Sequence, residues 1–263
     1  NQWQNETGFK KFASHFYNQT SFLIERRIRR DGSNFDLNPF SKNDDELIGL
    51  NTNFRNSLFF NRGKQYHSTT YSFLINETQN LLSVGSVAAK NQSHQLQYQH
   101  LVKKSWLFNF SGSTTSTEST SENYPNRNFE IDGYQIEPKI GYLFSKNASW
   151  DIFYEFQQKE NQIGAFETLK QTRLGTSFTF NSEKGFSMNG EFSMYNNSYE
   201  GNALSAVGFQ MLEGLQPGKN QTWRLLLQKN LTQYLDININ YQGRNSETSK
   251  TIHTGNVQLR AFF

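Results

Sequence analysis

Apolar and polar residues alternate along most of this chain with a period of two. In residues 134–144, aromatic or aliphatic side chains occupy most even positions, and Gln135, Glu137 and Lys139 lie between them. Residues 150–156 repeat the pattern. A period of two predicts β-strands with one apolar and one polar face. The chain is therefore expected to be all-β.

The length of the strands and the charges on their polar face favour a membrane barrel. Several segments alternate for about ten residues or more, the length that a tilted strand needs to cross a bilayer. Charged residues occupy the polar face in mid-strand, and we expect them to face a lumen. They are Glu137, Lys139, Asp151, Glu155, Arg173, Glu191, Arg224, Asp236 and Arg260. The pattern predicts a transmembrane antiparallel up-and-down β-barrel whose aromatic face meets lipid.

The links between the expected strands alternate between short and long. Strands are expected near 18–30, 47–60, 65–75, 94–102, 105–115, 130–144, 149–158, 167–180, 186–197, 220–229, 233–244 and 251–263. Outer-membrane barrels have short periplasmic turns and longer external loops. We therefore expect about 12 strands, within a range of roughly 10–14. Residues 18–263 would form the barrel, and residues 1–17 a periplasmic lead-in or linker.

Composition excludes several other classes of protein. Apolar residues make up only 35%, yet the chain has 24 Phe and 12 Tyr, as expected for a sheet with one wet face. There is no cysteine, which excludes disulfides and thiolate chemistry. A formal charge of +3 without a long basic run argues against nucleic-acid binding. No apolar stretch is long enough for a transmembrane helix.

Three tryptophans are expected at the membrane interface. Trp106, Trp150 and Trp223 are each assigned to the start of a strand just after a short turn. An indole there would lie at the inner interface with its N–H reaching water.

The end of the chain also alternates. Gly255, Val257, Leu259, Ala261 and Phe263 share one face of the last expected strand. This ending resembles the C-terminal strand that Gram-negative outer-membrane barrels present to the barrel-assembly machinery. The resemblance implies an assembly signal, closure of the barrel by the last strand against the first, and a location in the outer membrane.

A second resemblance covers roughly the last sixty residues. The stretch "MLEGLQPGKNQTWRLLLQKNLTQYLDININYQGR" and the use of Asn, Lys, Phe and Tyr resemble the C-terminal barrel region of large, uncharacterised Bacteroidota envelope proteins. The chain would then be the barrel end of a longer protein.

Candidate chemistry is sparse. A hydrolase would need a histidine beside a serine, with a third group that orients the ring. His67 and His94 are the candidate bases, although polar barrel histidines explain them more simply. Asp44, Asp45 and Glu46 offer oxygen ligands for calcium without the spacing of an EF-hand, so a solvated loop is favoured. We expect no catalytic residue, metal or cofactor.

Three functions stay open. The favoured one is a non-enzymatic outer-membrane barrel that anchors, or is a subunit of, a larger cell-envelope assembly. The alternatives are a diffusion pore for small polar solutes and an outer-membrane hydrolase. The expected partners are outer-membrane lipid, the barrel-assembly machinery and other envelope proteins, and no nucleic acid.

Overall fold

The computed structural model describes residues 2–13, 15–29, 46–64, 66–82, 85–183, 185–232 and 234–261. These residues form one sheet of 13 antiparallel strands that follow one another in chain order. The strands are β1 (Gln2–Ala13), β2 (Phe16–Arg29), β3 (Glu46–Phe60), β4 (His67–Leu82), β5 (Gly85–Val102), β6 (Trp106–Ser121), β7 (Phe129–Ser145), β8 (Ala148–Asn161), β9 (Thr168–Ser182), β10 (Phe186–Glu200), β11 (Gly218–Thr232), β12 (Leu235–Ser246) and β13 (Ile252–Ala261). A short 3-10 helix η1 (Pro125–Arg127) and a helix α1 (Ala206–Leu212) lie between strands. Within the described ranges, no helix is long and apolar enough to cross a bilayer.

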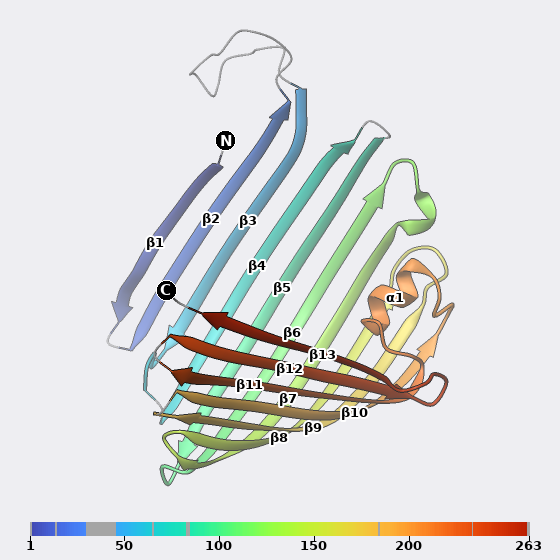
Figure 1. Ribbon diagram of the computed structural model, residues 1–263. Coiled ribbons are helices and arrows are strands. Elements are labelled where there is room, and N and C mark those ends of the chain that lie inside the picture. Colours follow the sequence, from blue (N-terminus) through green and yellow to red (C-terminus); the bar gives the residue numbers. More distant parts are fainter. Residues whose placement is uncertain are drawn as a thin grey trace.

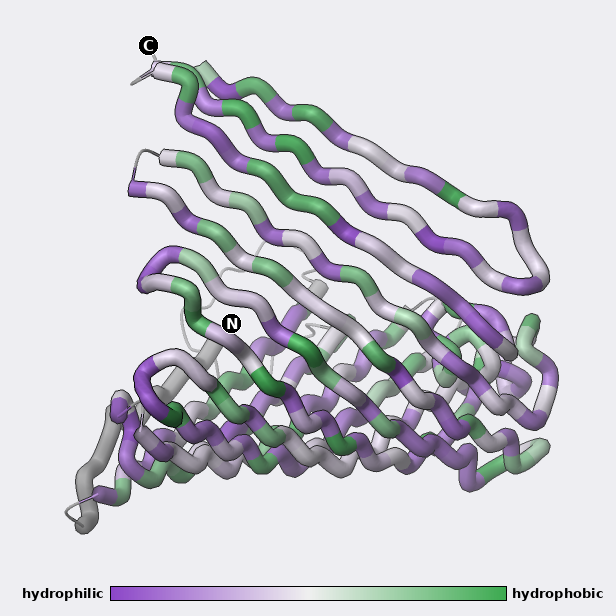
Figure 2. Tube along the Cα trace, turned by 90° about the horizontal axis from the view of Figure 1, so that it is seen from below, coloured by the Kyte–Doolittle hydropathy of each residue, from purple (hydrophilic) through white to green (hydrophobic). Residues whose placement is uncertain are grey.

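The sheet is strongly curled. Figure 1 shows the strands passing from β1 round to β13, so that β11 to β13 are drawn across strands such as β4, β5 and β6. Figure 2, turned by 90°, shows the two parts separated and shows residues of opposite hydropathy alternating along the strands. The predicted all-β antiparallel fold is confirmed.

Strands β2 to β13 correspond one to one with the twelve expected strands, but the sheet has a further strand. Residues 2–13, expected in a lead-in, form β1, which pairs with β2 from Gln2↔Glu25 to Ala13↔Phe16. The first strand therefore starts well before residue 18. Its sequence alternates only weakly, so pairing with β2 rather than its own pattern marks it as a strand.

One expected long link is also wrong. Most of residues 76–92 belong to β4 and β5, which pair without a register shift as far as Leu82↔Gly85. Residues 76–80 and 90–92 are polar, and the apolar residues between them do not alternate with polar ones, so the period-two signal is absent. Glu77 and Lys90 form a cross-strand ion pair of 3.4 Å there. Such polar strand ends suit an extension of the sheet beyond the bilayer.

The connection after β10 folds back onto the sheet. Residues 202–216, expected in a loop, lie between β10 and β11 and contain α1, whose start is capped by the Ser205 hydroxyl accepting from the Gly208 N–H at 2.9 Å. Val207, Met211 and Leu212 of α1 pack with Ile131 and Leu169. These contacts form a small apolar core at one end of the strands.

The sheet is open among the described residues. β1 lies at one edge and β13 at the other, and β13 pairs with β12 alone. The expected closure of the last strand against the first is therefore not found there. In an antiparallel order of 13 strands, the first and last run the same way, so pairing between them would be parallel. Phe263 lies outside the described residues.

Candidate functional site

The two faces of the sheet carry different chemistry. On β8, the side chains of Trp150, Ile152 and Tyr154 are exposed, whereas Phe153 and Glu155 on the opposite face are buried. Crowding of side chains is expected on the inside of a curled sheet. We call the face with Phe153 and Glu155 the concave face, and the face with Trp150 and Ile152 the outer face.

The strand register brings all nine expected lumen charges to the concave face. Cross-strand partners share a face, and Glu155 pairs with Arg173, Glu191 with Arg224, and Asp236 with Arg260. The three remaining residues, Glu137, Lys139 and Asp151, lie on the same side of β7 and β8.

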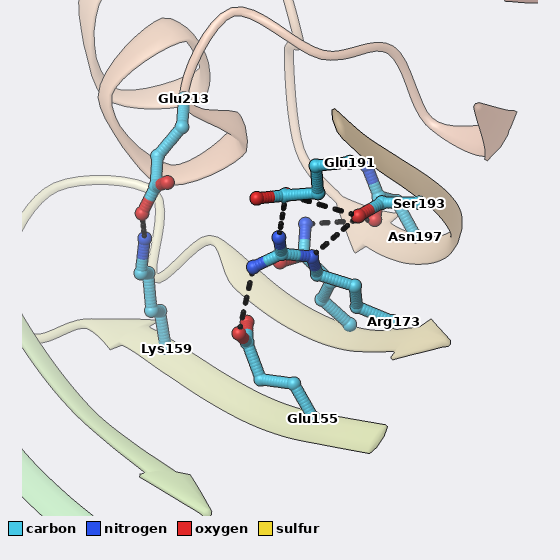
Figure 3. A network of polar contacts seen from close by, with 8 residues as sticks. Glu155, Lys159, Arg173, Glu191, Ser193, Asn197 and Glu213 are labelled. Carbon is cyan, nitrogen blue, oxygen red and sulfur yellow. Dashed lines mark hydrogen bonds and ion pairs between the residues drawn. The ribbon is translucent and has the colours of Figure 1, made fainter. Parts of the chain in front are cut away.

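Arg173 is the centre of a polar network on β8, β9 and β10 (Figure 3). Its guanidinium donates to Glu155 at 3.2 Å, to Glu191 at 2.5 Å and to the Ser193 hydroxyl at 3.1 Å. The buried Gln171 donates to Asn197 at 2.9 Å beside it. Glu155 is only 6% exposed and Ser193 is fully buried. Each charge in this network is therefore met by an opposite charge or a hydrogen-bonding group.

Aromatic rings stabilise the same cation. The Arg173 guanidinium carbon lies 4.6 Å from the centre of the Phe153 ring and 5.4 Å from that of Tyr195. The ammonium nitrogen of Lys139 lies 5.6 Å from the centre of the same Phe153 ring. A buried phenylalanine on the charged face thus serves two cations.

Gly175 makes room for Phe153. The two residues pair across β8 and β9, and a Cβ on Gly175 would lie 2.2 Å from the Phe153 ring and 2.9 Å from the Ser193 hydroxyl. Any larger residue there must displace the ring over which Arg173 lies.

We expect Gly175→Val to lower the free energy of unfolding by about 1–3 kcal/mol, the usual cost of overpacking. Gly190→Val is the control, because a Cβ there meets only Leu225 at 3.9 Å. Urea unfolding of both variants in lipid vesicles measures the difference. Equal losses for the two variants would show that Phe153 is not confined as described.

Helix α1 is attached to the concave face by polar contacts as well as by its apolar side. The ammonium of Lys159 donates to Glu213 at 2.5 Å and to the Met211 carbonyl at 3.2 Å. Arg244 donates to the Gly214 carbonyl at 3.2 Å, and Asn197 to the Gln216 carbonyl at 3.0 Å. The connection therefore covers part of the concave face at the long-link end of the strands.

Two hollows open on the concave face. One, of about 430 Å³, lies at β10 to β13 and includes Glu191, Arg224, Gln242 and Arg244 in its lining. The other, of about 260 Å³, lies at β4 to β7 and is lined mainly by hydroxyl and amide side chains together with Glu137 and Lys139. The concave face can thus hold water and polar solutes, but neither hollow is enclosed.

The expected interface tryptophans do not share one position. Trp106 and Trp150 follow short turns, lie on either side of Tyr142 and line an apolar hollow of about 610 Å³ on the outer face. Trp223 also faces outward, as its pairing with Phe192 shows, but β11 follows the long connection that contains α1. The expectation that Trp223 follows a short turn is therefore wrong. A place in the membrane interface stays a prediction for all three.

The described residues of the last strand lie as expected on the outer face. Gly255, Val257, Leu259 and Ala261 pair with Tyr241, Ile239, Ile237 and Leu235 of β12. Val257 and Leu259 are more than 60% exposed. Their role in assembly stays a prediction.

The histidines form no hydrolase site among the described residues. His67 bonds Asn61 at 2.9 Å, and the Nδ1 of His94 bonds the Tyr71 hydroxyl at 2.8 Å. Both lie on the outer face, where their cross-strand partners are His100 and Phe73. Neither ring contacts a serine hydroxyl, so the arrangement needed for nucleophilic catalysis is missing from the described part of the chain.

No metal centre is found within the described ranges, since no three His, Cys, Asp or Glu side chains gather there. Asp44 and Asp45 of the suggested calcium loop lie outside the described residues.

Several residues of the site were not expected from the sequence. Phe153, Lys159, Gly175, Ser193 and α1 all depend on which strands pair and in which register. A phenylalanine on an otherwise polar strand face was the one signal that pointed to Phe153.

Comparison with known proteins identifies a fold and no family. No family model matches the chain, and no curated protein matches it. The ferric-catecholate import receptor Fiu from E. coli K12 matches with a TM-score of 0.59 and 8% sequence identity, over 99% of this chain and 55% of that chain. The ferric yersiniabactin uptake receptor FyuA from Yersinia pestis matches with a TM-score of 0.55 and 9% identity, over 98% of this chain and 51% of that chain.

A third structure extends the comparison. CdiB from Acinetobacter baumannii matches with a TM-score of 0.50 and 10% identity, over 100% of this chain and 52% of that chain. The chain thus spans about half the length of each of these three structures. It has the fold of Gram-negative outer-membrane β-barrels, in agreement with the predicted class and location. The likeness to Bacteroidota envelope proteins stays a prediction.

Proposed function

We propose that this chain is a non-enzymatic part of the wall of a large outer-membrane barrel, and that this barrel belongs to a larger cell-envelope assembly. The observation that carries the proposal is the open, curled sheet. Nearly the whole chain superposes on about half of each of two receptors with a TM-score above 0.5. A curvature shared with half of a larger barrel suits a segment of wall better than a small closed barrel.

The concave face supports a structural role. Arg173 is paired on both sides with Glu155 and Glu191, and it holds no position open for a substrate. Charges paired in this way stabilise the wall rather than catalyse a reaction. The absence of a His–Ser pair in the described ranges agrees with this proposal.

A second candidate is passage of polar solutes through the completed barrel. The two polar hollows on the concave face favour it. Barrels of about 16 strands or more enclose an aqueous or plugged lumen, and a barrel twice the length of this chain would be in that range. Two of the compared structures are of import or uptake receptors.

The test uses the natural protein that carries this sequence. We expect it in the outer-membrane fraction, with folded and boiled samples migrating differently on a gel. In planar bilayers, we expect no steady open channel if the barrel serves an assembly that closes its lumen. A stable conductance of constant size would favour the solute pathway instead. A protein that is soluble without detergent and migrates alike before and after boiling would contradict both candidates.

A further inference from the structure

The two edge strands of the sheet run in the same direction. Every neighbouring pair from β1 to β13 is antiparallel, and the described part of the chain forms 13 strands. Within the described ranges, β1 pairs only with β2, and β13 only with β12. Direct pairing of β1 with β13 would therefore be parallel.

The edge at β13 is exposed along its whole length. All ten side chains of β13 are exposed, whereas most side chains of the neighbouring β12 are half-buried. The outward side chains of β13 include Val257 and Leu259, which would face lipid. The free edge thus lies beside a lipid-facing surface, where water cannot satisfy the backbone.

An open edge is unstable in a membrane. About half of the N–H and C=O groups of an edge strand point away from the sheet. Unpaired groups of this kind are strongly unfavourable in hydrocarbon, and membrane barrels therefore close. Both edges of this sheet need strands as partners.

We propose that a second β-sheet, with an odd number of membrane-spanning strands from sequence other than residues 1–263, pairs antiparallel with both β1 and β13. Its strands carry apolar residues on the outside and polar residues beside Asn256, Gln258 and Arg260 on the inside. This inference rests on the proposed function, because it names what completes the wall.

The odd number follows from direction. An antiparallel meander that begins beside β13 and ends beside β1 must have an odd number of strands, since its two outer strands both run opposite to this chain's edges. If β13 paired with β1 of the same chain, or with β1 of one second copy related by an axis along the membrane normal, that pairing would be parallel. The compared receptors, of which this chain covers 51% to 55%, leave room for a second sheet of comparable size.

The test is photo-crosslinking at the edge in the natural protein. A photoreactive phenylalanine analogue replaces Val257 on β13, and in a control variant it replaces the cross-strand Ile239 on β12. We expect the probe at Val257 to link to a peptide outside residues 1–263 with alternating apolar and polar residues. The probe at Ile239, which has β11 and β13 on its two sides, is expected to link within the chain.

Two further probe positions show whether β13 and its partner strand are antiparallel. Probes at Gly255 and Leu259 both face outward, and nothing lies within 4 Å of a Cβ at Gly255. In an antiparallel seam, the probe at Gly255 links later in the partner sequence than the probe at Leu259. The same comparison at Trp3 and Thr7 of β1, which pair with Ile24 and Thr20 of β2, tests the other edge.

The crosslinks show whether a second sheet pairs with β1 and β13. Antiparallel order at both edges supports it. A crosslink from Val257 to residues 2–13, to a second copy of this chain, or to lipid alone would overturn it while leaving the protein in the outer membrane. Absence of the protein from the outer-membrane fraction would overturn the proposed function, and the inference with it.

Discussion

Replacing Arg173 with methionine is expected to lower the free energy of unfolding by about 3 kcal/mol, near the lower end of the cost of breaking a buried ion pair. The variant removes the cation that Glu155 and Glu191 share. Glu155 is almost fully buried and would be left without its charged partner. Glu191 is more exposed, so water replaces part of its loss. Urea unfolding in lipid vesicles measures the effect.

Two controls isolate the buried charge. Arg27→Met breaks the exposed pair with Glu25, at 3.1 Å, and should cost well under about 1 kcal/mol, as exposed pairs do. Adding Glu155→Gln to Arg173→Met should restore part of the stability, because no unpaired buried charge then remains. Similar losses for Arg27→Met and Arg173→Met would contradict the described network.

A charged residue on the outer face is expected to destabilise the protein about as much as the loss of Arg173. Phe110 lies on the outer face of β6, five positions into the strand, and pairs with Tyr98 and Pro138. We expect Phe110→Arg to lower the free energy of unfolding in vesicles by about 2–4 kcal/mol, the cost of arginine near the bilayer midplane. The cause is transfer of a cation into hydrocarbon.

The matched variant is Ser113→Arg on the concave face of the same strand. Its cross-strand neighbours are Gln95 and Gln135, so the new cation meets polar groups and water. We expect a change within about 1 kcal/mol, since lumen substitutions mainly alter selectivity. Phe110→Leu separates the charge from the lost ring. If Ser113→Arg destabilises more than Phe110→Arg, the two faces have been assigned the wrong way round.

Much of the sheet could be predicted because its strands carry the period-two signal. From β7 to β13, the apolar positions alternate strictly enough to place most strand ends within a few residues. The signal is absent where apolar residues do not alternate with polar ones. This explains why the outer parts of β4 and β5 were taken for a link and why β1 was taken for a lead-in.

The sequence predicted on which face of the sheet the charged residues of the candidate site lie, but not which of them meet. Alternation assigns Arg173, Glu155 and Glu191 to one side of the sheet. Their meeting depends on the register of β8, β9 and β10, which the turns between these strands determine. Alternation also cannot show that Gly175 lies opposite Phe153. Helix α1 has only seven residues, and its stability comes from packing on Ile131 and Leu169.

The outer face of this curled sheet is expected to meet lipid, and the concave face is not. Since the chain has no cysteine, single cysteines along residues 106–116 of β6 can each carry a nitroxide label. In vesicles, collision with lipid-dissolved oxygen should peak at 106, 108, 110, 112 and 114, which face outward, and fall at the positions between them. Equal oxygen accessibility at all positions, with equal access for a water-soluble nickel reagent, would show that the two faces do not differ in their contact with lipid.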